Sequence, residues 1–297
     1  MKLKQILRHF VLFIITIPCA FFAFGAPHKD SLHFSTVLFK ITNSTSQKVS
    51  YIFGTHHAFG PQFFDSLTNA NELLLSCDLV IKENIDMPGH LAEDIINGRK
   101  ELTKWEKYLS KDNLQYIREM FANSPTDFHK MTPTEMYVFL ARYAKEKICL
   151  QRDMSLAYLT LDTYIGTKAS QKNIPLLGLE TTEEQIKLIN EDVAQMPKKV
   201  HKKRLAKIID ILKNNLQMNC DETDWYRQMN INYQLNQPCQ NSLILTNRNH
   251  KWMQTLSQQL KTNNCFIVVG LSHLMYQCGL LNQLKESGYT ITPVPVK

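Results

Sequence analysis

Short runs of apolar residues alternate along the chain with longer segments whose apolar residues recur at helical spacing. Runs of this length, rich in β-branched and aromatic residues and bounded by polar turns, are typical of buried strands. Because the strands alternate with helices, the pattern predicts an α/β fold with a mostly parallel central sheet flanked by helices. The runs that predict strands lie at residues 37–41, 49–53, 79–81, 174–179, 265–269 and 289–294.

Two long stretches carry no comparable strand pattern and are predicted to be helical insertions in a single domain of residues 26–297. The first covers about residues 91–165 and the second about residues 198–236. The basic segment 198–213 places its apolar residues at helical spacing, which indicates an amphipathic helix with a solvated basic face. We interpret it as a helix packed on the body of the domain rather than as a nucleic-acid or membrane site.

The N-terminus has the pattern of a secretory signal peptide. Three basic residues precede an almost unbroken apolar stretch at residues 10–24, and Ala23-Phe24-Gly25 offers small residues at the spacing that a signal peptidase needs. The stretch is shorter than the roughly 20 apolar residues that a retained membrane helix needs. We therefore expect residues 1–25 to be removed and the mature protein to be exported, either periplasmic or secreted, without stable membrane insertion.

The net charge of the mature chain does not distinguish between the possible classes of partner. The formal net charge is +7, and removal of the three basic residues of the signal peptide lowers it to +4. This balance is ordinary for a globular protein and does not argue for nucleic acid as a partner. A peptide or a small molecule is the expected substrate.

Six cysteines remain after the signal peptide, and an oxidising compartment permits them to form disulfides. Six cysteines allow fifteen pairings, so the sequence does not fix the connectivity. Cys220 and Cys239 bracket a polar segment with little apolar surface of its own, which favours a bridge between them; the alternative is two unpaired thiols. Cys77 and Cys265 lie in apolar runs and could equally be buried thiols.

Four strand-like runs are each followed by a polar residue that can take part in chemistry. In open parallel sheets, ligands bind beyond the carboxyl ends of the strands, and those ends lie at one edge. Residues more than two hundred positions apart can therefore converge on one pocket. The four residues are His57, Glu83, Glu180 and His273.

Both histidines stand three residues after a glycine that follows a strand, at Gly54 and Gly270. Two imidazoles with one or two carboxylates can hold a divalent metal that activates water and polarises a carbonyl group. Without a metal, a histidine held by a carboxylate can act directly as a general base. The simpler alternative is that each histidine only satisfies local backbone groups.

Several motifs along nearly the whole mature chain resemble the TraB/GumN family, which includes the Tiki proteins. The chain is more distantly similar to erythromycin esterases and to ChaN-like haem-binding lipoproteins, and these relatives also imply an α/β fold with a large helical insertion. The segments that carry the resemblance are Leu38-Phe39-Lys40-Ile41, Tyr51 to His57, Asp78 to Glu83, Met131-Thr132-Pro133, Leu161-Asp162, Leu177 to Thr181, Arg248-Asn249, Val268 to Leu274 and Gly288-Tyr289.

The resemblance implies a metal-dependent hydrolase of the peptidase or amidase type. It implies His57, Glu83 and His273 as catalytic residues and metal ligands, with Arg248 and Asn249 as supporting catalytic groups. The metal would be a divalent ion such as manganese, cobalt or zinc. The ChaN-like relatives imply the alternative function, a protein that binds haem or another ligand without turnover.

Two further residues need a role. Glu180 could support the histidines from behind, or it could cap the helix that follows. His56 stands where the family usually has an aliphatic residue. We expect its side chain to point away from the site, although a second imidazole could compete as a ligand.

Overall fold

The computed structural model describes residues 33–154 and 159–297. The expected signal peptide lies outside these ranges. Within them, no helix combines the length and the apolar character that a membrane span requires.

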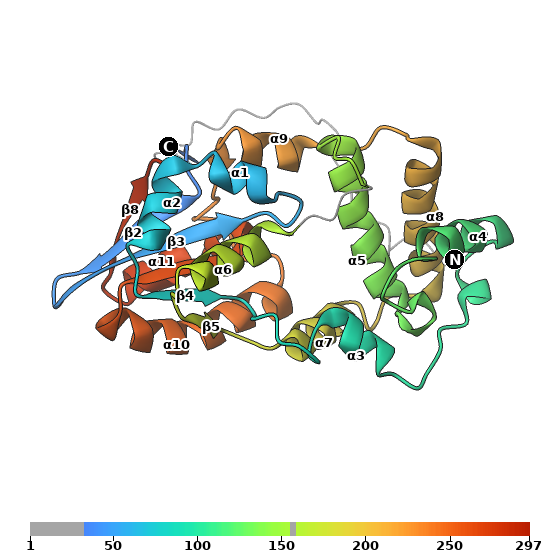
Figure 1. The fold of residues 1–297 in the computed structure, drawn as a ribbon, viewed down its shortest axis with the longest axis horizontal. Helices are drawn as coiled ribbons and strands as arrows, with labels where there is room; N and C mark the ends of the chain where they lie inside the picture. The colour runs from blue at the N-terminus through green and yellow to red at the C-terminus, as the bar shows by residue number, and fades with distance from the viewer. Residues whose placement is uncertain (1–32, 155–158) are drawn as a thin grey trace, which may run out of the picture. The chain divides into compact units, whose positions relative to one another are not determined.

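A six-stranded sheet forms the centre of the fold, in the order β5-β4-β7-β3-β2-β8 (Figure 1). The strands β5, β4, β7 and β3 run parallel. β2 pairs antiparallel with both β3 and β8, so β8 points in the same direction as the four parallel strands and β2 alone is reversed. The prediction of an α/β fold with a mostly parallel sheet is confirmed. The strands are β2 Leu38–Asn43, β3 Ser46–Thr55, β4 Leu79–Lys82, β5 Leu176–Gly178, β7 Cys265–Gly270 and β8 Thr290–Val294, and a separate pair is formed by β1 His33–Phe34 and β6 Ile231–Asn232.

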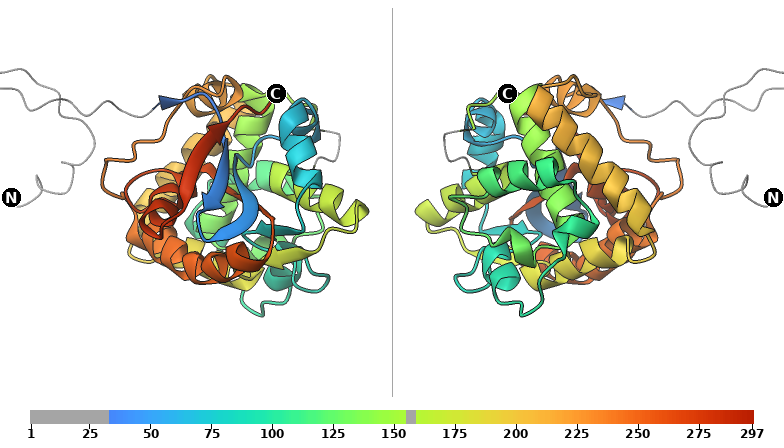
Figure 2. Two further views of the ribbon diagram at one scale, coloured as in Figure 1. Left: turned by 90° about the vertical axis from the view of Figure 1, so that its left-hand side faces the viewer. Right: turned by 90° about the vertical axis from the view of Figure 1, so that its right-hand side faces the viewer.

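Helices cover both faces of the sheet. Figures 1 and 2 show α2 and α6 on one face and α10 and α11 on the other. Every residue of β7 is buried because it lies in the middle of the sheet and is covered on both sides, as expected of its continuous apolar run. The helices are α1 Pro61–Asp65, α2 Thr68–Leu75, α3 Ala92–Asn97, α4 Lys111–Met120, α5 Pro133–Ala144, α6 Leu161–Gln171, α7 Thr182–Asp192, α8 Lys198–Asn214, α9 Asp221–Arg227, α10 Arg248–Thr262 and α11 Leu280–Glu286.

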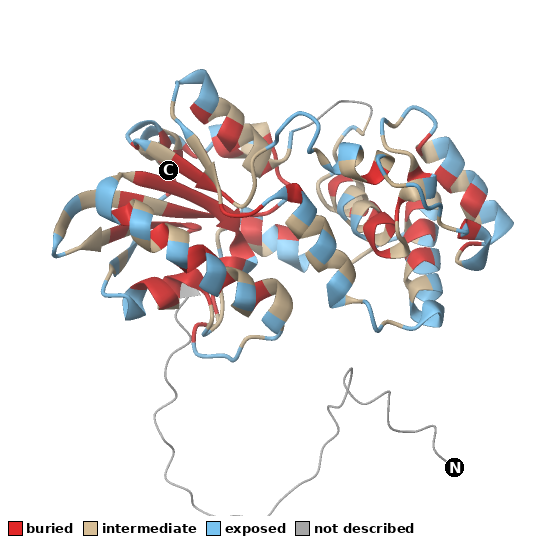
Figure 3. Ribbon diagram, turned by 90° about the horizontal axis from the view of Figure 1, so that it is seen from below, coloured by how far each residue is buried: buried red, intermediate tan, exposed pale blue. Residues whose placement is uncertain are grey.

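The helices α3, α4 and α5, together with α8, enclose a second hydrophobic core. Trp105, Met136 and Leu140 belong to it, and Figure 3 shows its buried residues apart from those of the sheet. The basic helix α8 contributes Leu205, Ile208, Ile209 and Leu212, the residues whose spacing indicated an amphipathic helix. Its basic residues at positions 202, 203 and 207 are exposed.

A capping box starts α5, the helix that closes the site described below. The Thr132 hydroxyl accepts from the Glu135 N–H at 3.2 Å, and a Glu135 carboxylate oxygen accepts from the Thr132 N–H at 2.9 Å. Pro133 occupies the first helical position, where its missing N–H costs no hydrogen bond. The sequence therefore fixes where this helix begins.

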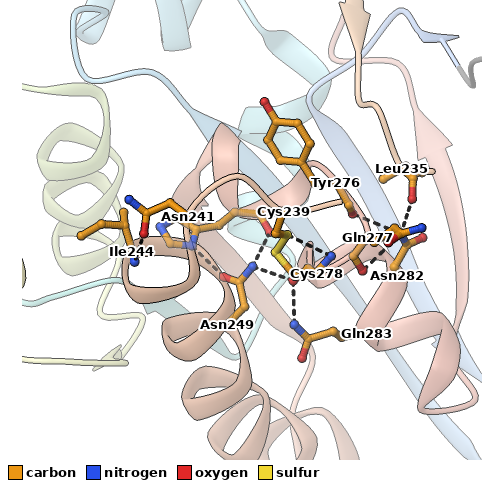
Figure 4. Close-up of a disulfide and its surroundings, with 11 residues drawn as sticks. Leu235, Cys239, Asn241, Ile244, Asn249, Tyr276, Gln277, Cys278, Asn282 and Gln283 are labelled. Carbon is orange, nitrogen blue, oxygen red and sulfur yellow. Dashed lines mark hydrogen bonds between the residues drawn. A yellow bond between two sulfur atoms is a disulfide. The ribbon is translucent and has the colours of Figure 1, made fainter. Parts of the chain in front are cut away.

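The expected disulfide between Cys220 and Cys239 is wrong. The structure pairs Cys149 with Cys220 and Cys239 with Cys278, with Cα–Cα distances of 5.4 and 5.9 Å. Figure 4 shows the second bridge. Cys77 and Cys265 are unpaired and buried. Two disulfides are consistent with an oxidising extracellular compartment.

The physical reason lies in the segment between Cys220 and Cys239, which the sequence pattern predicts to be polar and weakly held. It contains α9 and β6, and it buries Tyr226, Ile231 and Tyr233 completely in the core around the sheet. These anchors fix the segment along its length. The cysteines at its two ends, Cys220 and Cys239, are therefore held apart, and each bonds a different cysteine.

Candidate active site

The parallel strands β3, β4 and β7 deliver the candidate residues to one edge of the sheet. Thr55 at the end of β3 pairs with Gly270 of β7, and Lys82 at the end of β4 pairs with Val268 of β7. The chain therefore leaves all three strands at the same level, as the parallel arrangement predicted. The candidate residues that follow strand ends at this edge are His57, Glu83, Glu180 and His273.

Both glycines of the Gly-x-x-His elements permit close approaches at this edge. A Cβ atom on Gly54 would lie 2.7 Å from Leu271 Cδ1 and 3.3 Å from Leu271 Cα. A Cβ atom on Gly270 would lie 3.1 Å from Glu83 Oε1. The absence of that carbon lets the Gly270 N–H donate to Glu83 Oε1 at 2.7 Å.

His57 forms an ion pair with Asp162 in the first turn of α6. The His57 Nδ1 to Asp162 Oδ2 distance is 2.7 Å, and the side chains are 59% and 20% exposed. The charge of Asp162 raises the pKa of His57 to about 9. Burial acts to raise the pKa of Asp162, but the charge and hydrogen bond of His57 outweigh it and bring that pKa down to about 2. The pair is ionised at neutral pH.

His273 lies in the opposite electrostatic environment. Its Nδ1 is 2.6 Å from Asn249 Oδ1, while the Asn249 amide nitrogen donates to the Cys278 carbonyl at 2.8 Å. Because Asn249 donates through its nitrogen, its oxygen accepts from Nδ1–H, and the lone pair of His273 is on Nε2. Burial lowers the pKa of His273 to about 4, so the ring is neutral at neutral pH. The ring packs on Trp252 at a centroid distance of 4.3 Å.

The guanidinium group of Arg248 connects the buried acidic residues with His273. Arg248 Nη1 donates to His273 Nε2 at 3.0 Å, and Nη2 donates to Glu83 Oε2 at 2.8 Å. Glu180 accepts from Arg248 Nε at 3.1 Å and from Nη2 at 2.5 Å. Gln185 adds a hydrogen bond to Glu83 Oε2 at 3.2 Å. Burial acts to raise the pKa of Glu83, but nearby positive charges and the Gly270 N–H give a net lowering.

The side chains of this cluster do not fit a metal ion as they are arranged. A metal needs the lone pairs of its ligands directed at one point. The Nε2 lone pair of His273 and Oε2 of Glu83 are instead directed at the guanidinium of Arg248, which supplies the positive charge there. Among residues 33–154 and 159–297, no group of three or more His, Cys, Asp or Glu side chains could hold a metal ion. The divalent metal implied by the resemblance stays a prediction.

A cavity of about 330 Å³ opens beside these groups. It lies beyond the carboxyl end of β4, and α5, α6, α7 and α10 contribute to its wall; Figure 1 shows α5 beyond this end of the sheet. A second hollow of about 620 Å³ borders the other side of His57 and shares Arg142 with the first. The polar residues that line the first cavity are His57, Lys82, Glu83, Asn84, Arg142, Thr160, Asp162, Thr163, Gln185 and Arg248.

A family model for the TraB/PrgY/gumN family matches residues 37–293, which is most of the chain. The chain belongs to the TraB/PrgY/gumN family. The matched region of this family member contains both Gly-x-x-His elements and all the residues that line the cavity. Comparison with curated proteins gives no match, and comparison with solved structures gives none either.

In this family member, the expected catalytic residues divide into two groups. Glu83, Arg248, Asn249 and His273 form one connected hydrogen-bonded cluster. His57 lies in a separate pair with Asp162, although His57, Glu83 and Arg248 line the same cavity. The two imidazoles therefore differ in partner, exposure and charge.

Glu180 and His56 also have defined places. Glu180 bonds Arg248 and supports the cluster from behind, and the following helix is capped by Thr181 instead. His56 is turned toward α9, where its Nε2 is 3.4 Å from Glu222 Oε1, and its Nδ1 accepts from the Ala58 N–H at 3.2 Å.

Asp162 and Lys82 are two of the cavity residues that the sequence does not identify as site residues. Asp162 follows the helix N-cap Thr160 and resembles any acidic residue in a first helical turn. Lys82 immediately precedes Glu83 at the end of β4. The structure shows that Lys82 is buried, which the sequence pattern alone does not reveal. A lysine in an otherwise apolar strand was the available hint.

Proposed function

We propose that this protein is a hydrolase that cleaves an ester or amide bond with His57 as its general base. The observation that carries the proposal is the His57–Asp162 pair at the border of the cavity. A base held by a carboxylate and open to a cavity meets the geometric requirement for proton transfer to or from bound water.

The hydrogen bond to Asp162 determines which ring nitrogen of His57 would take the proton. Because Asp162 accepts from Nδ1–H, a neutral His57 has its lone pair on Nε2. No described residue forms a hydrogen bond with Nε2. In the proposed step, Nε2 takes a proton from water as the water oxygen attacks the carbonyl carbon. The same nitrogen returns the proton to the leaving alkoxide or amine, and Asp162 stabilises the imidazolium in between.

The second imidazole has a different role in this proposal. His273 is buried and neutral, with its lone pair engaged by Arg248. Environments that separate the pKa values of two groups this far are typical of a division of labour between them. We assign His273 to positioning Arg248, which in turn holds Glu83 at the cavity wall.

Hydrolysis of small chromogenic esters and peptide anilides by the purified mature chain tests the proposal. His57→Gln should lower kcat/KM by about 100- to 10,000-fold, the usual contribution of general-base catalysis. The matched control is His90→Gln. His90 pairs with Glu183 at 2.6 Å and is exposed to a similar degree, yet it does not line the cavity.

Equal rates for wild type and His57→Gln would overturn the assignment of the base. A loss of equal size in His90→Gln would show that the effect is not specific to the site. The alternative function implied by the ChaN-like resemblance is tested on the same protein. A Soret band on addition of haem, with no turnover of any ester or anilide, would favour a binding protein.

A further inference from the structure

Lys82 is a buried cation that the proposed proton transfer does not use. It ends β4, and the whole residue is only 4% exposed. Its side chain extends along α6, because a Cβ atom built on Gly166 would lie 3.0 Å from Lys82 Cδ and 3.0 Å from Lys82 Nζ. A glycine at this point of the helix leaves the room that the lysine occupies.

The charge of Lys82 acts on Asp162, where it is one of the smaller causes that lower the pKa, but the ammonium group is not bonded to a described residue. It takes part in no hydrogen bond and no ion pair there, although a buried ammonium ordinarily has one. In the described ranges, the fully enclosed side-chain polar atoms that make no hydrogen bond are Thr55 Oγ1, His56 Nε2 and Trp252 Nε1. Since Lys82 Nζ is not among them and Lys82 lines the cavity, the ammonium reaches the cavity space.

The other cations of the cavity are largely neutralised by the chain itself. Arg248 is bound by Glu83 and Glu180, and His57 is bound by Asp162. Arg142, on α5, forms a longer ion pair with Glu146, in which Nε and Oε1 are 3.6 Å apart. The positive charge that the chain leaves least neutralised in the cavity is therefore that of Lys82.

Apolar side chains complete the cavity wall. Leu188 and Ile189 of α7 and Ile244 border the same space as Lys82. An oxyanion bound to Lys82 would thus stand next to a region suited to a small apolar group. A carboxylate with a single charge matches the single unpaired ammonium better than a phosphate dianion does.

We propose that the cavity binds the carboxylate group of a small, partly apolar substrate through Lys82. The inference rests on the proposed function only in naming that substrate as a carboxylate-bearing ester or amide. The carboxylate would hold the substrate beside His57, so that the reacting carbonyl group meets the base. Lys82 would then determine which esters and amides the protein accepts.

Isothermal titration calorimetry with N-acetyl-L-leucine tests the subsite without turnover. Its neutral counterpart, N-acetyl-L-leucinamide, has the same shape without the charge, and inorganic phosphate serves as the alternative oxyanion. Wild type should bind N-acetyl-L-leucine more tightly than either. Lys82→Met should weaken that binding by roughly 10- to 100-fold, the usual effect of losing a charged hydrogen bond. Lys203→Met, on the exposed face of α8, removes the same charge elsewhere and should change nothing.

Gly166→Ala provides a second variant that keeps the charge of Lys82. The added methyl group displaces the end of a flexible side chain, and alanine favours the helix, so the fold should be retained. Binding of N-acetyl-L-leucine should weaken in this variant as well. It keeps the test valid if Lys82→Met does not fold.

Three results would overturn the subsite. They are unchanged affinity in folded Lys82→Met and Gly166→Ala, equal binding of the leucinamide, and absence of binding by the wild type. Tighter, Lys82-dependent binding of phosphate would overturn the carboxylate assignment. His57→Gln protein should lose hydrolytic activity and still bind N-acetyl-L-leucine. This result would show that binding at the subsite does not depend on the proposed function.

Discussion

Replacement of Asp162 by asparagine should lower the pKa of His57. Asp162 is the largest cause of the rise of that pKa from 6.5 to about 9. The asparagine keeps the shape of the side chain and removes its charge, so the pKa should return toward 6.5. Because the His57 side chain is 59% exposed, solvent screens part of the interaction. We expect a fall of at least about one pKa unit.

The fall has a direct consequence for the protonation state at working pH. At pH 7.5, a histidine with a pKa of about 9 is only about 3% neutral, whereas one with a pKa of about 6.5 is about 90% neutral. Asp162→Asn would therefore have more of its base in the neutral form. The base would also be weaker and less firmly oriented.

Titration of the histidine ring signals by NMR measures this pKa without a substrate. The signal of His57 is assigned as the one that His57→Gln lacks. The control is Asp65→Asn, because Asp65 accepts from Tyr164 and Lys168 of the same helix without touching His57. A midpoint that is the same in wild type and Asp162→Asn, or that shifts equally in Asp65→Asn, would refute the reasoning.

The same pair makes stability depend on pH. Asp162 has a lowered pKa, so its contribution is fully present above pH 3.8 and is lost as the pH falls toward about 2. His57 has a raised pKa, so its contribution is present below pH 6.5 and is lost as the pH rises through about 9. Between these limits Asp162→Asn should lower the unfolding temperature most. An equal lowering at pH 5 and pH 10 would contradict the pairing.

Three further predictions follow from the buried cluster and the cysteines. Arg248→Met should lower the free energy of unfolding by about 3–5 kcal/mol, because Glu83 and Glu180 lose their shared cation. The exposed control Arg227→Met should change the free energy of unfolding by less than about 1 kcal/mol. Equal small changes for the two variants in denaturant titrations would contradict the role of the cluster. Incubation with a chelator should leave any hydrolysis intact, whereas loss with EDTA and recovery with manganese, cobalt or zinc would show that Arg248 yields its position to a metal. Peptide mapping without reduction should find Cys149 linked to Cys220 and Cys239 linked to Cys278, with each bridge contributing up to about 4 kcal/mol, and a Cys220–Cys239 peptide would contradict the structure.

The strands could be predicted from the sequence because each one is a short run of apolar residues, which is a local property of the chain. The run at 265–269 is apolar throughout and lies in the middle of the sheet, and the run at 79–81 becomes β4. Parallel strands bring their carboxyl ends to one edge, so the neighbourhood of Glu83 and His273 could be predicted without a structure. The two side chains are 3.9 Å apart between Oε1 and Nε2.

The partners of these residues depend on packing that the sequence pattern does not contain. Nothing in the pattern shows that Asp162 reaches His57 across 105 positions or that Arg248 lies between Glu83 and Glu180. Cys220 and Cys239 are close in sequence, yet each bonds a distant cysteine because the segment between them is anchored in the core. Tertiary packing decided each of these contacts.

The dependence of kcat/KM on pH, measured on the best ester or anilide substrate, tests the role of His57 most directly. In wild type, kcat/KM should rise tenfold per pH unit and level off near pH 9, where His57 loses its proton. In Asp162→Asn, the plateau should be lower and should begin at a lower pH. Activity that does not change between pH 6 and 10, or a profile that Asp162→Asn leaves in place, would show that His57 is not the base.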